Sequence, residues 1–249
     1  MKFPILFFLM MFSTVRSAVV EEPVVHAGVK FRVVKLDPAR VTVVWKDPQG
    51  EPYRSFDQVQ AAFAKRGKKV EFLMNAGIFE PGGIPSGLHV EDRKTLHPVN
   101  LADAPGNFFL KPNGVLWIEA AGGREAFIST PQDFIAREQQ LRLMSSRSLE
   151  YAVQSGPLLL IGGKRHPAFT EKSTSKLLRN GVGVDGGKRL VFAMTDKGEV
   201  VNFWDFAGLF LKLGCRDALF LDGDISQMVV NPDKPVASNR FGAMFVVAE

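Results

Sequence analysis

Short runs of β-branched and aromatic residues recur along this chain of 249 residues, and several of them end at Gly, Asp or Asn. Runs of this length between turn residues are typical of β-strands joined by tight connections. The clearest connection is Asp185-Gly186-Gly187, which lies between Gly181–Val184 and Leu190–Met194 and predicts a hairpin. Because hairpins join antiparallel strands, the pattern favours a fold built mainly on antiparallel sheets.

Other β-rich runs extend this pattern. Phe31–Leu36 and Val41–Trp45 are separated by Asp37-Pro38, so we expect a second hairpin there. Gly162-Gly163-Lys164 lacks the spacing of a phosphate-binding loop and is interpreted as a hairpin turn. The remaining strands are expected at the other apolar runs: Val70–Met74, Leu88–Val90, Phe108–Leu110, Val115–Ile118, Tyr151–Gln154, Leu158–Ile161, Ala218–Leu221, Gln227–Val230 and Phe241–Ala248.

Three helices are predicted among the strands. Ser55 opens the first, with Gln58 completing a capping-box pattern, and Thr130-Pro131 opens a short second one. The third, Asn202–Leu213, is capped by Asn202, has apolar residues at helical spacing and is closed by Gly214. Strands outnumber helices and no linker-like segment divides the chain. The predicted class is therefore α+β, with mostly antiparallel sheets and a few packed helices in a single domain.

The amino end is typical of a secretory signal peptide. Lys2 gives it a positive start, Phe3–Phe12 is a nearly unbroken apolar run, and small residues follow as far as Ala18. The run is shorter than the ~20 residues that a spanning helix needs, so no stable membrane span is expected. We predict that residues 1–17 are a signal peptide, that residues 18–249 form the mature domain, and that the protein is exported to the periplasm or secreted. A buried first strand or helix, or an uncleaved anchor, is the alternative interpretation.

Composition excludes several classes of protein. Cys215 is the single cysteine, so the chain can form no internal disulfide and no cysteine-rich metal site, and a packing role is expected for it. The formal net charge of +5 comes from scattered basic residues without interleaved aromatic ones, which argues against nucleic acid as a partner. A mild positive charge suits an anionic substrate. No feature of the sequence sets an oligomeric state.

Polar side chains stand beside glycines where four apolar strands are expected to end. They are Asn75 in Asn-Ala-Gly, Gln154 in Gln-Ser-Gly, Arg179 in Arg-Asn-Gly and Asp222 in Asp-Gly-Asp. A glycine lets backbone approach a ligand closely, and a strand tip gives the neighbouring side chain a rigid base. We expect these four tips to converge on one pocket.

The same segments carry a resemblance to a known family. Five of them follow one another in order: Met74–Phe79, Gly106–Gly114, Gln154–Pro157, Arg179–Gly183 and Ala218–Gly223. This succession resembles the phosphodiester glycosidase family, which includes the uncovering enzyme and many exported bacterial proteins, and it covers roughly residues 70–249. The resemblance implies an exported hydrolase, a glycosidase that cleaves the glycosidic bond of a sugar-1-phosphodiester. The identity of the sugar stays open.

One segment departs from the family pattern. The family often has a run of the type Asp-Gly-Gly-Gly-Ser, in which Asp222, Gly223 and Ser226 of this chain match. Asp224 and Ile225 do not match. The departure indicates a bacterial subgroup whose activity can differ from that of the uncovering enzyme.

Cleavage at the sugar C1 passes through an oxocarbenium-like state. A nearby carboxylate can stabilise the positive charge of this state or activate the water that attacks C1. Asp222 is the first candidate for this carboxylate because the family motif matches there, and Asp224 is the second. The alternative for Asp222 is an aspartate that caps its own turn. Predicted substrate-binding residues are polar side chains at or beside the strand tips: Asn75, Gln154, Ser155, Arg179, Asn180 and Ser226.

Arg179 is the predicted phosphate contact, since its planar guanidinium suits a bidentate anion, and a surface charge is the alternative. No cofactor is predicted, although Asp222 and Asp224 leave a divalent cation open as an alternative. Two other functions stay open. One is a non-catalytic protein that binds cell-envelope glycans, and the other is a metal-dependent phosphodiesterase that cuts the P–O bond.

Overall fold

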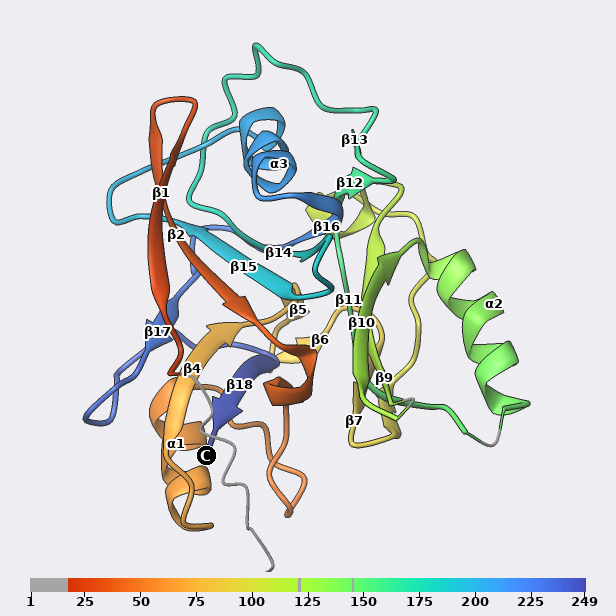
Figure 1. The fold of residues 1–249 in the computed structure, drawn as a ribbon, viewed down its shortest axis with the longest axis vertical. Coiled ribbons are helices and arrows are strands. Elements are labelled where there is room, and N and C mark those ends of the chain that lie inside the picture. Colours follow the sequence, from red (N-terminus) through yellow and green to blue (C-terminus); the bar gives the residue numbers. More distant parts are fainter. Residues whose placement is uncertain (1–17, 121, 145) are drawn as a thin grey trace, which may run out of the picture.

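The computed structural model describes residues 18–120, 122–144 and 146–249 (Figure 1). The predicted signal peptide, residues 1–17, lies outside the described residues. Three antiparallel sheets and a small hairpin carry the described strands, with three α-helices on the outside. The predicted α+β class is therefore confirmed. In the part of the chain that the structure describes, the helices are too short or too polar to cross a membrane.

The largest sheet has seven strands and forms the upper part of the molecule in Figure 1. Its order is β1 (Glu21–His26), β2 (Val29–Leu36), β15 (Leu190–Thr195), β14 (Asn180–Asp185), β16 (Cys215–Asp222), β12 (Leu158–Ile161) and β13 (Lys164–Arg165). Two predicted hairpins lie in it: β14 pairs with β15, and β12 pairs with β13, both antiparallel.

The two smaller sheets and the hairpin complete the strand framework. The five-stranded sheet runs β10 (Arg124–Ser129), β9 (Gly114–Ala120), β11 (Ser148–Ser155), β7 (His89–Glu91) and β8 (Lys94–His97). The four-stranded sheet runs β17 (Met228–Val230), β4 (Val70–Asn75), β18 (Met244–Ala248) and β3 (Thr42–Val44). The hairpin pairs β5 (Phe79–Glu80) with β6 (Ile84–Pro85) and lies between these two sheets in Figure 1.

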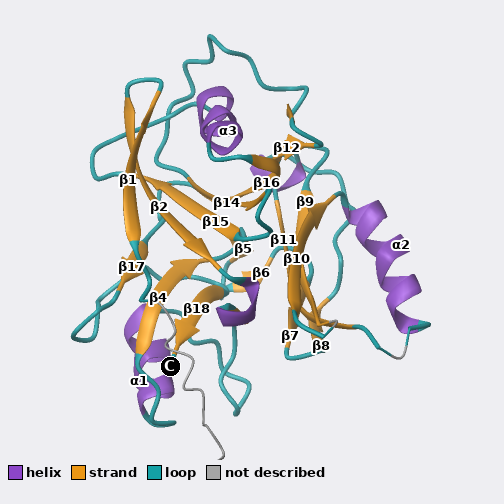
Figure 2. Ribbon diagram, viewed as in Figure 1, coloured by secondary structure: helices purple, strands orange, loops and turns teal. Residues whose placement is uncertain are grey.

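Each sheet is covered by one helix on its outer face (Figure 2). The helices are α1 (Phe56–Ala64) on the four-stranded sheet, α2 (Pro131–Arg142) on the five-stranded sheet and α3 (Phe203–Lys212) on the seven-stranded sheet. Asn202 caps α3 as predicted, because its Oδ1 accepts a hydrogen bond from Asp205 N at 2.8 Å.

Two glycines of β14 let α3 lie close to the seven-stranded sheet. A Cβ on Gly181 would come within 3.2 Å of the Phe206 ring, and one on Gly183 within 2.8 Å of the Phe210 ring. The Gly183 Cβ would also meet Cys215 Sγ at 2.7 Å, which shows the predicted packing role of this cysteine. The Arg-Asn-Gly-Val-Gly motif therefore has a packing reason as well as any functional one.

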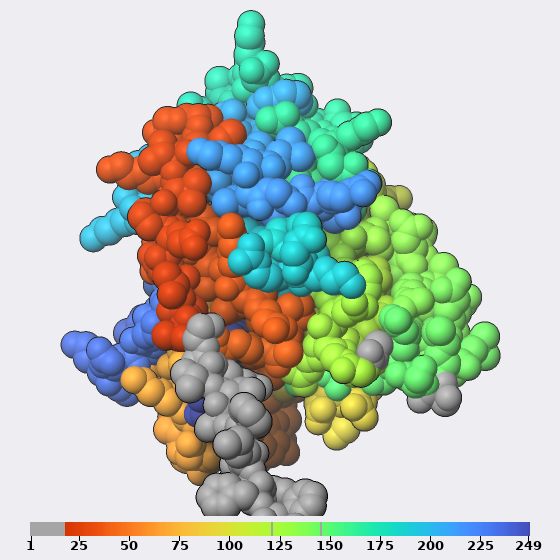
Figure 3. All heavy atoms as spheres, viewed as in Figure 1, coloured from red at the N-terminus to blue at the C-terminus, as the bar shows by residue number. Residues whose placement is uncertain are grey.

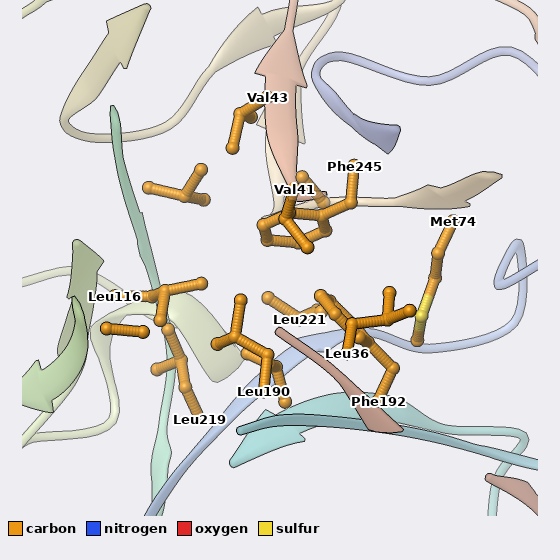
Figure 4. Packing of buried hydrophobic residues seen from close by; sticks show 14 of the residues in the cluster. Leu36, Val41, Val43, Met74, Leu116, Leu190, Phe192, Leu219, Leu221 and Phe245 are labelled. Atoms are coloured by element: carbon orange, nitrogen blue, oxygen red, sulfur yellow. The ribbon is translucent and has the colours of Figure 1, made fainter. Parts of the chain in front are cut away.

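The three sheets share one hydrophobic core (Figure 4). Phe192 lies at its centre, with its ring centroid 5.0 Å from those of Phe72 and Phe245. Leu116 and Leu221 reach the same cluster from the five-stranded and the seven-stranded sheets. Because residues of all three sheets fill one space, the sheets cannot shift independently without opening a cavity.

Three local predictions were wrong. Phe31–Leu36 and Val41–Trp45 do not form a hairpin, because the 3₁₀ turn Pro38–Arg40 sends the chain to another sheet, where β3 pairs with β18. Leu36 and Val41 both enter the shared core, so burial rather than local pairing decides this connection.

The other two wrong predictions concern a short strand and a helix cap. The Phe108–Leu110 run is not a strand but mostly a 3₁₀ helix, Asn107–Phe109, whose Phe108 is buried. Ser55 makes no capping bond to the start of α1, because its hydroxyl donates to the Asp57 carboxylate instead, so Gln58 completes no capping box.

Truncating the central ring should destabilise the whole fold. We expect Phe192→Ala to lower the free energy of unfolding by about 3–5 kcal/mol, because it leaves a cavity in the shared core between the seven-stranded and four-stranded sheets. Urea unfolding measures this change. Val200→Ala, at a side chain that is 46% exposed, is the control and should shift the midpoint little. Equal shifts for both variants would contradict a single shared core.

Candidate functional site

Asp222 is the last residue of β16 and is held there by its backbone. Asp222 N donates to Asn180 Oδ1 at 2.7 Å, and Asp222 Oδ1 accepts a hydrogen bond from Gly223 N at 2.7 Å. The carboxylate thus caps the turn that follows it, as the alternative reading of the motif predicted. One carboxylate oxygen is used in this way, and the residue is partly open to solvent.

Two buried amides join the sheets beside Asp222. Asn180 Nδ2 donates to Asn75 Oδ1 at 2.9 Å, which links β14 of the seven-stranded sheet to β4 of the four-stranded one. The same Asn75 oxygen accepts a hydrogen bond from Gln227 N at 2.9 Å. Asn75 is 1% exposed and Asn180 is fully buried, so both contacts are made away from water. The two asparagines therefore fix the position of Asp222 relative to the four-stranded sheet.

Ser155 joins the third sheet to the same place. Its hydroxyl donates to Leu221 O at 3.0 Å and accepts a hydrogen bond from Ile78 N at 3.2 Å. The close approach also explains the glycine of Asn-Ala-Gly, because a Cβ on Gly77 would lie 2.7 Å from Gln154 O. All four predicted strand tips thus meet at one point in the fold, through Asn75, Ser155, Asn180 and the backbone at Leu221 and Asp222.

Burial sets the ionisation of Asp222. Desolvation raises the pKa of this carboxyl to about 6, and the nearby charge of Asp224 acts in the same direction. The hydrogen bond from Gly223 N opposes them, because it stabilises the ionised form. A carboxyl that titrates close to neutrality can act as a base or nucleophile when ionised and as an acid when protonated. Asp224 lies in the turn and is exposed.

The turn after Asp222 is braced from a distant part of the chain. Asn239 Nδ2 donates to Ile225 O at 3.1 Å, and Asn239 N donates to Gln227 Oε1 at 2.6 Å. Asn239 belongs to none of the five motifs, and no local pattern in the sequence marks it. Its role arises only from the fold, which brings the segment before β18 against the turn.

Unpartnered polar atoms lie at the same site. Asn75 Nδ2 and Ser226 Oγ are both buried and have no hydrogen-bond partner among the described residues. Ser226 is next to Gln227, whose backbone is bonded to Asn75. Buried polar groups are usually paired, so two of them beside a carboxylate of raised pKa indicate a site that accepts a polar ligand.

Gln154 faces away from this group and is used by the backbone. Its Oε1 accepts from Leu88 N at 3.0 Å and Asn100 N at 2.8 Å, while its Nε2 donates to Asn100 O at 2.7 Å. A Cβ on Gly87 would lie 2.3 Å from the same oxygen. The amide therefore orders the segment from residue 87 to residue 100, and its geometry does not support the predicted contact with substrate.

Arg179 is also enclosed. Its side chain donates to Val201 O at 2.8 Å and to Ser175 O at 3.2 Å, and its guanidinium carbon lies 3.6 Å from the Phe203 ring centroid. Burial lowers its pKa to about 10, and Asp224 raises it in opposition. Only 1% of the residue is exposed, and its Nη1 is buried without a partner among the described residues, so this geometry does not support the predicted bidentate phosphate contact. The side chain instead fastens the segment between β13 and β14, which arches over α3 at the top of Figure 3.

Metal ligands are sparse at this site. Across the described residues, no group of three or more His, Cys, Asp or Glu side chains is arranged to hold a metal ion. Asp222 and Asp224 offer two carboxylates, of which one is partly engaged with Gly223 N.

Fold and site together define a class of protein. Strand tips from three antiparallel sheets surround one carboxyl of raised pKa with fixed amides and an unpartnered hydroxyl, which marks a candidate functional site. The sequence profile of the phosphodiester glycosidase family matches residues 68–247. The chain belongs to the phosphodiester glycosidase family.

Known proteins agree with this assignment. The chain is 32% identical over 190 residues to the uncharacterized protein YigE of Escherichia coli K12, covering 76% of this chain and 69% of that protein. The catalytic domain of zebrafish N-acetylglucosamine-1-phosphodiester alpha-N-acetylglucosaminidase, auto-inhibited by its pro-peptide, has a similar fold, with a TM-score of 0.63 and 17% identity. That match covers 93% of this chain and 82% of the zebrafish chain. A hypothetical protein from Synechocystis matches with a TM-score of 0.56 and 13% identity, over 92% of this chain and 61% of its own.

Removing the buried amide at Asn180 should loosen the site. Asn180→Ala leaves Asp222 N and Asn75 Oδ1 short of a partner, so we expect it to lower the free energy of unfolding by about 2–4 kcal/mol. Chemical denaturation measures the loss. Asn107→Ala, at an exposed asparagine with no side-chain bond to a neighbouring sheet, is the matched control. A loss as small as that of the control would show that the amide link does not hold the sheets.

Proposed function

We propose that this protein hydrolyses the glycosidic bond of a sugar-1-phosphodiester. The observation that carries the proposal is the raised pKa of Asp222 at the meeting point of three sheets, in a chain of the phosphodiester glycosidase family. The name of the zebrafish relative suggests N-acetylglucosamine as the first sugar to test. The phosphate-bearing part leaves with little need of a proton, so the main demand falls on the charge that develops at C1.

Asp222 meets that demand in its ionised form. A carboxylate held away from water interacts more strongly with developing positive charge than an exposed one does. Its backbone bond to Asn180 fixes its position before substrate arrives, which reduces the cost of reorganisation. Asp224, exposed and two residues on, is the proposed second carboxylate. Retention or inversion depends on how these groups are spaced around the bound sugar.

The other site residues divide into two groups. Asn75 Nδ2 and Ser226 Oγ are the proposed contacts for substrate oxygens, since both atoms lack a partner in the described chain. Asn180 and Ser155 hold the strand tips together, and Gln154 orders the neighbouring segment. The enclosed charge of Arg179 contributes to the local potential rather than to a direct contact.

We also propose that the protein acts outside the cytoplasm, with residues 1–17 as its signal peptide. The support is the short apolar run after Lys2, which fits an exported bacterial protein of the periplasm or medium. We propose no cofactor, because the carboxylate chemistry described above needs none.

Hydrolysis of a panel of sugar-1-phosphodiesters, beginning with N-acetylglucosamine, tests the function. We expect the wild type to release free reducing sugar and Asp222→Asn to lose at least about 100-fold in kcat/KM, because the amide cannot stabilise positive charge. Mass spectrometry identifies the products, and Asp217→Asn on the same strand is the control. Release of a sugar phosphate, abolished by a chelator, would indicate a metal-dependent phosphodiesterase. No turnover by folded wild type would favour a glycan-binding protein.

The pH profile tests the state of Asp222. Its pKa of about 6 means that the carboxylate form dominates above pH 6 and the protonated form below it. If the ionised form acts, kcat/KM should rise as pH increases, with its midpoint near 6 and about a tenfold fall for each unit below it. Steady-state rates between pH 4 and 8 measure this limb. If the rate instead falls as the pH increases through 6, Asp222 acts as an acid.

A further inference from the structure

Arg54 has an unusual backbone conformation for a residue that is not glycine. It precedes α1 with a φ of 65°, in the left-handed region. This conformation costs roughly 1–2 kcal/mol for an L-residue. It is held by neighbours on both sides, because Phe241 N donates to Arg54 O at 2.7 Å and Ser55 N donates to Tyr53 O at 2.7 Å. Backbone of this kind persists where surrounding structure imposes it, often beside functional sites.

The side chain of Arg54 lies against Phe79 and Gly83 but has no hydrogen-bond or ion-pair partner among the described residues. Its guanidinium carbon lies 5.9 Å from the Phe79 ring centroid, and a Cβ on Gly83 would come within 2.0 Å of its Nη1. No hydrogen bond or ion pair to this guanidinium is found among the described residues. The nearby Glu80 accepts a hydrogen bond from Ser86 Oγ at 2.8 Å instead. Arg54 is half-buried, its guanidinium lies beside the Phe79 ring, and its donors have no partner among the described residues.

One short segment joins Arg54 to the Asp222 site. Asn75, at the start of the segment, contacts the side-chain amide of Asn180, which also binds the backbone of Asp222. Phe79, at the end of the segment, lies beside the guanidinium of Arg54. Four residue steps span at most about 14 Å, even when fully extended. The segment is anchored midway, since Ala76 N donates to Ala243 O at 2.9 Å. Asn75, which is joined to Asp222 through Asn180, and the unpaired guanidinium therefore lie at the two ends of one fixed stretch of chain.

We propose that Arg54 binds the anionic phosphodiester group of the substrate. The inference rests on the proposed function and adds to it the residue that recognises the charged part. An arginine suits this role because its planar fork can donate two hydrogen bonds to phosphate oxygens. Arg179, the cation that the sequence motifs suggested, is 1% exposed; two of its nitrogens donate to backbone carbonyls, and its Nη1 is buried without a partner among the described residues. Gly83 leaves the space in which the Arg54 guanidinium lies, and Phe79 supports it from the other side.

Two ligands that differ in the phosphate test the proposal. Isothermal titration compares N-acetylglucosamine 1-phosphate with methyl N-acetylglucosaminide on wild type, Arg54→Gln, Arg54→Gly and Arg240→Gln. Arg54→Gly removes the guanidinium while relieving the left-handed backbone, so it should fold even if the glutamine variant does not. Arg240 is exposed and close in sequence to Phe241, which makes its variant a control for loss of a nearby charge.

We expect both Arg54 variants to bind the phosphorylated ligand about 10- to 100-fold more weakly, with unchanged affinity for the methyl glycoside. Arg240→Gln should change neither affinity by more than about threefold. An equal loss in Arg54→Gln and Arg240→Gln, or no preference of the wild type for the phosphorylated ligand, would overturn the proposal.

The hydrolysis assay keeps this inference separate from the proposed function. Turnover of a phosphodiester that is unaffected by Arg54→Gly would refute the role of Arg54 and leave the glycosidase function standing. Phosphate-dependent binding that needs Arg54, without turnover of any phosphodiester, would support Arg54 and refute the glycosidase function.

Discussion

The amide contact between Asn75 and Asn180 is the interaction on which the site depends. It crosses from one sheet to another where hydrophobic packing alone would fix distance but not orientation. Because each amide offers both a donor and an acceptor, the pair can also hold the backbone of Asp222 and of Gln227. The shared core below it, centred on Phe192, makes the sheets a rigid support for this polar junction.

The same junction partly desolvates the carboxyl of Asp222. Enclosing Asp222 between strand tips removes water from its carboxyl, and a single backbone bond from Gly223 only partly replaces that water. The ionised form is therefore less stable than it would be in solution, and in the reaction that we propose a positively charged transition state would restore the lost interaction. An aspartate that was paired and fully solvated in this position would have a more stable carboxylate, which we would expect to be less reactive.

Local features were predictable from sequence where neighbours in the chain decide them. The turn at Asp185 and the cap of α3 at Asn202 depend on residues close in sequence, and both were found. The path after Leu36 was not, because the shared core decides it. The sequence motifs pointed to residues of the site, but they did not show which contacts hold those residues in place. Gln154 and Arg179 stand in the motifs and bind backbone in the fold, whereas Arg54 lies outside every motif and is recognised only from its φ and its surroundings.

Cys215 has a practical consequence for studying motion. It is the single cysteine of the chain, it is buried, and burial raises the pKa of its thiol to about 12. A thiol this rarely ionised reacts slowly with maleimides and similar reagents. A cysteine introduced at an exposed position, such as Lys172 in the segment that arches over α3, would therefore take a fluorophore or spin label selectively. The native chain thus serves as its own low-background scaffold for spectroscopy.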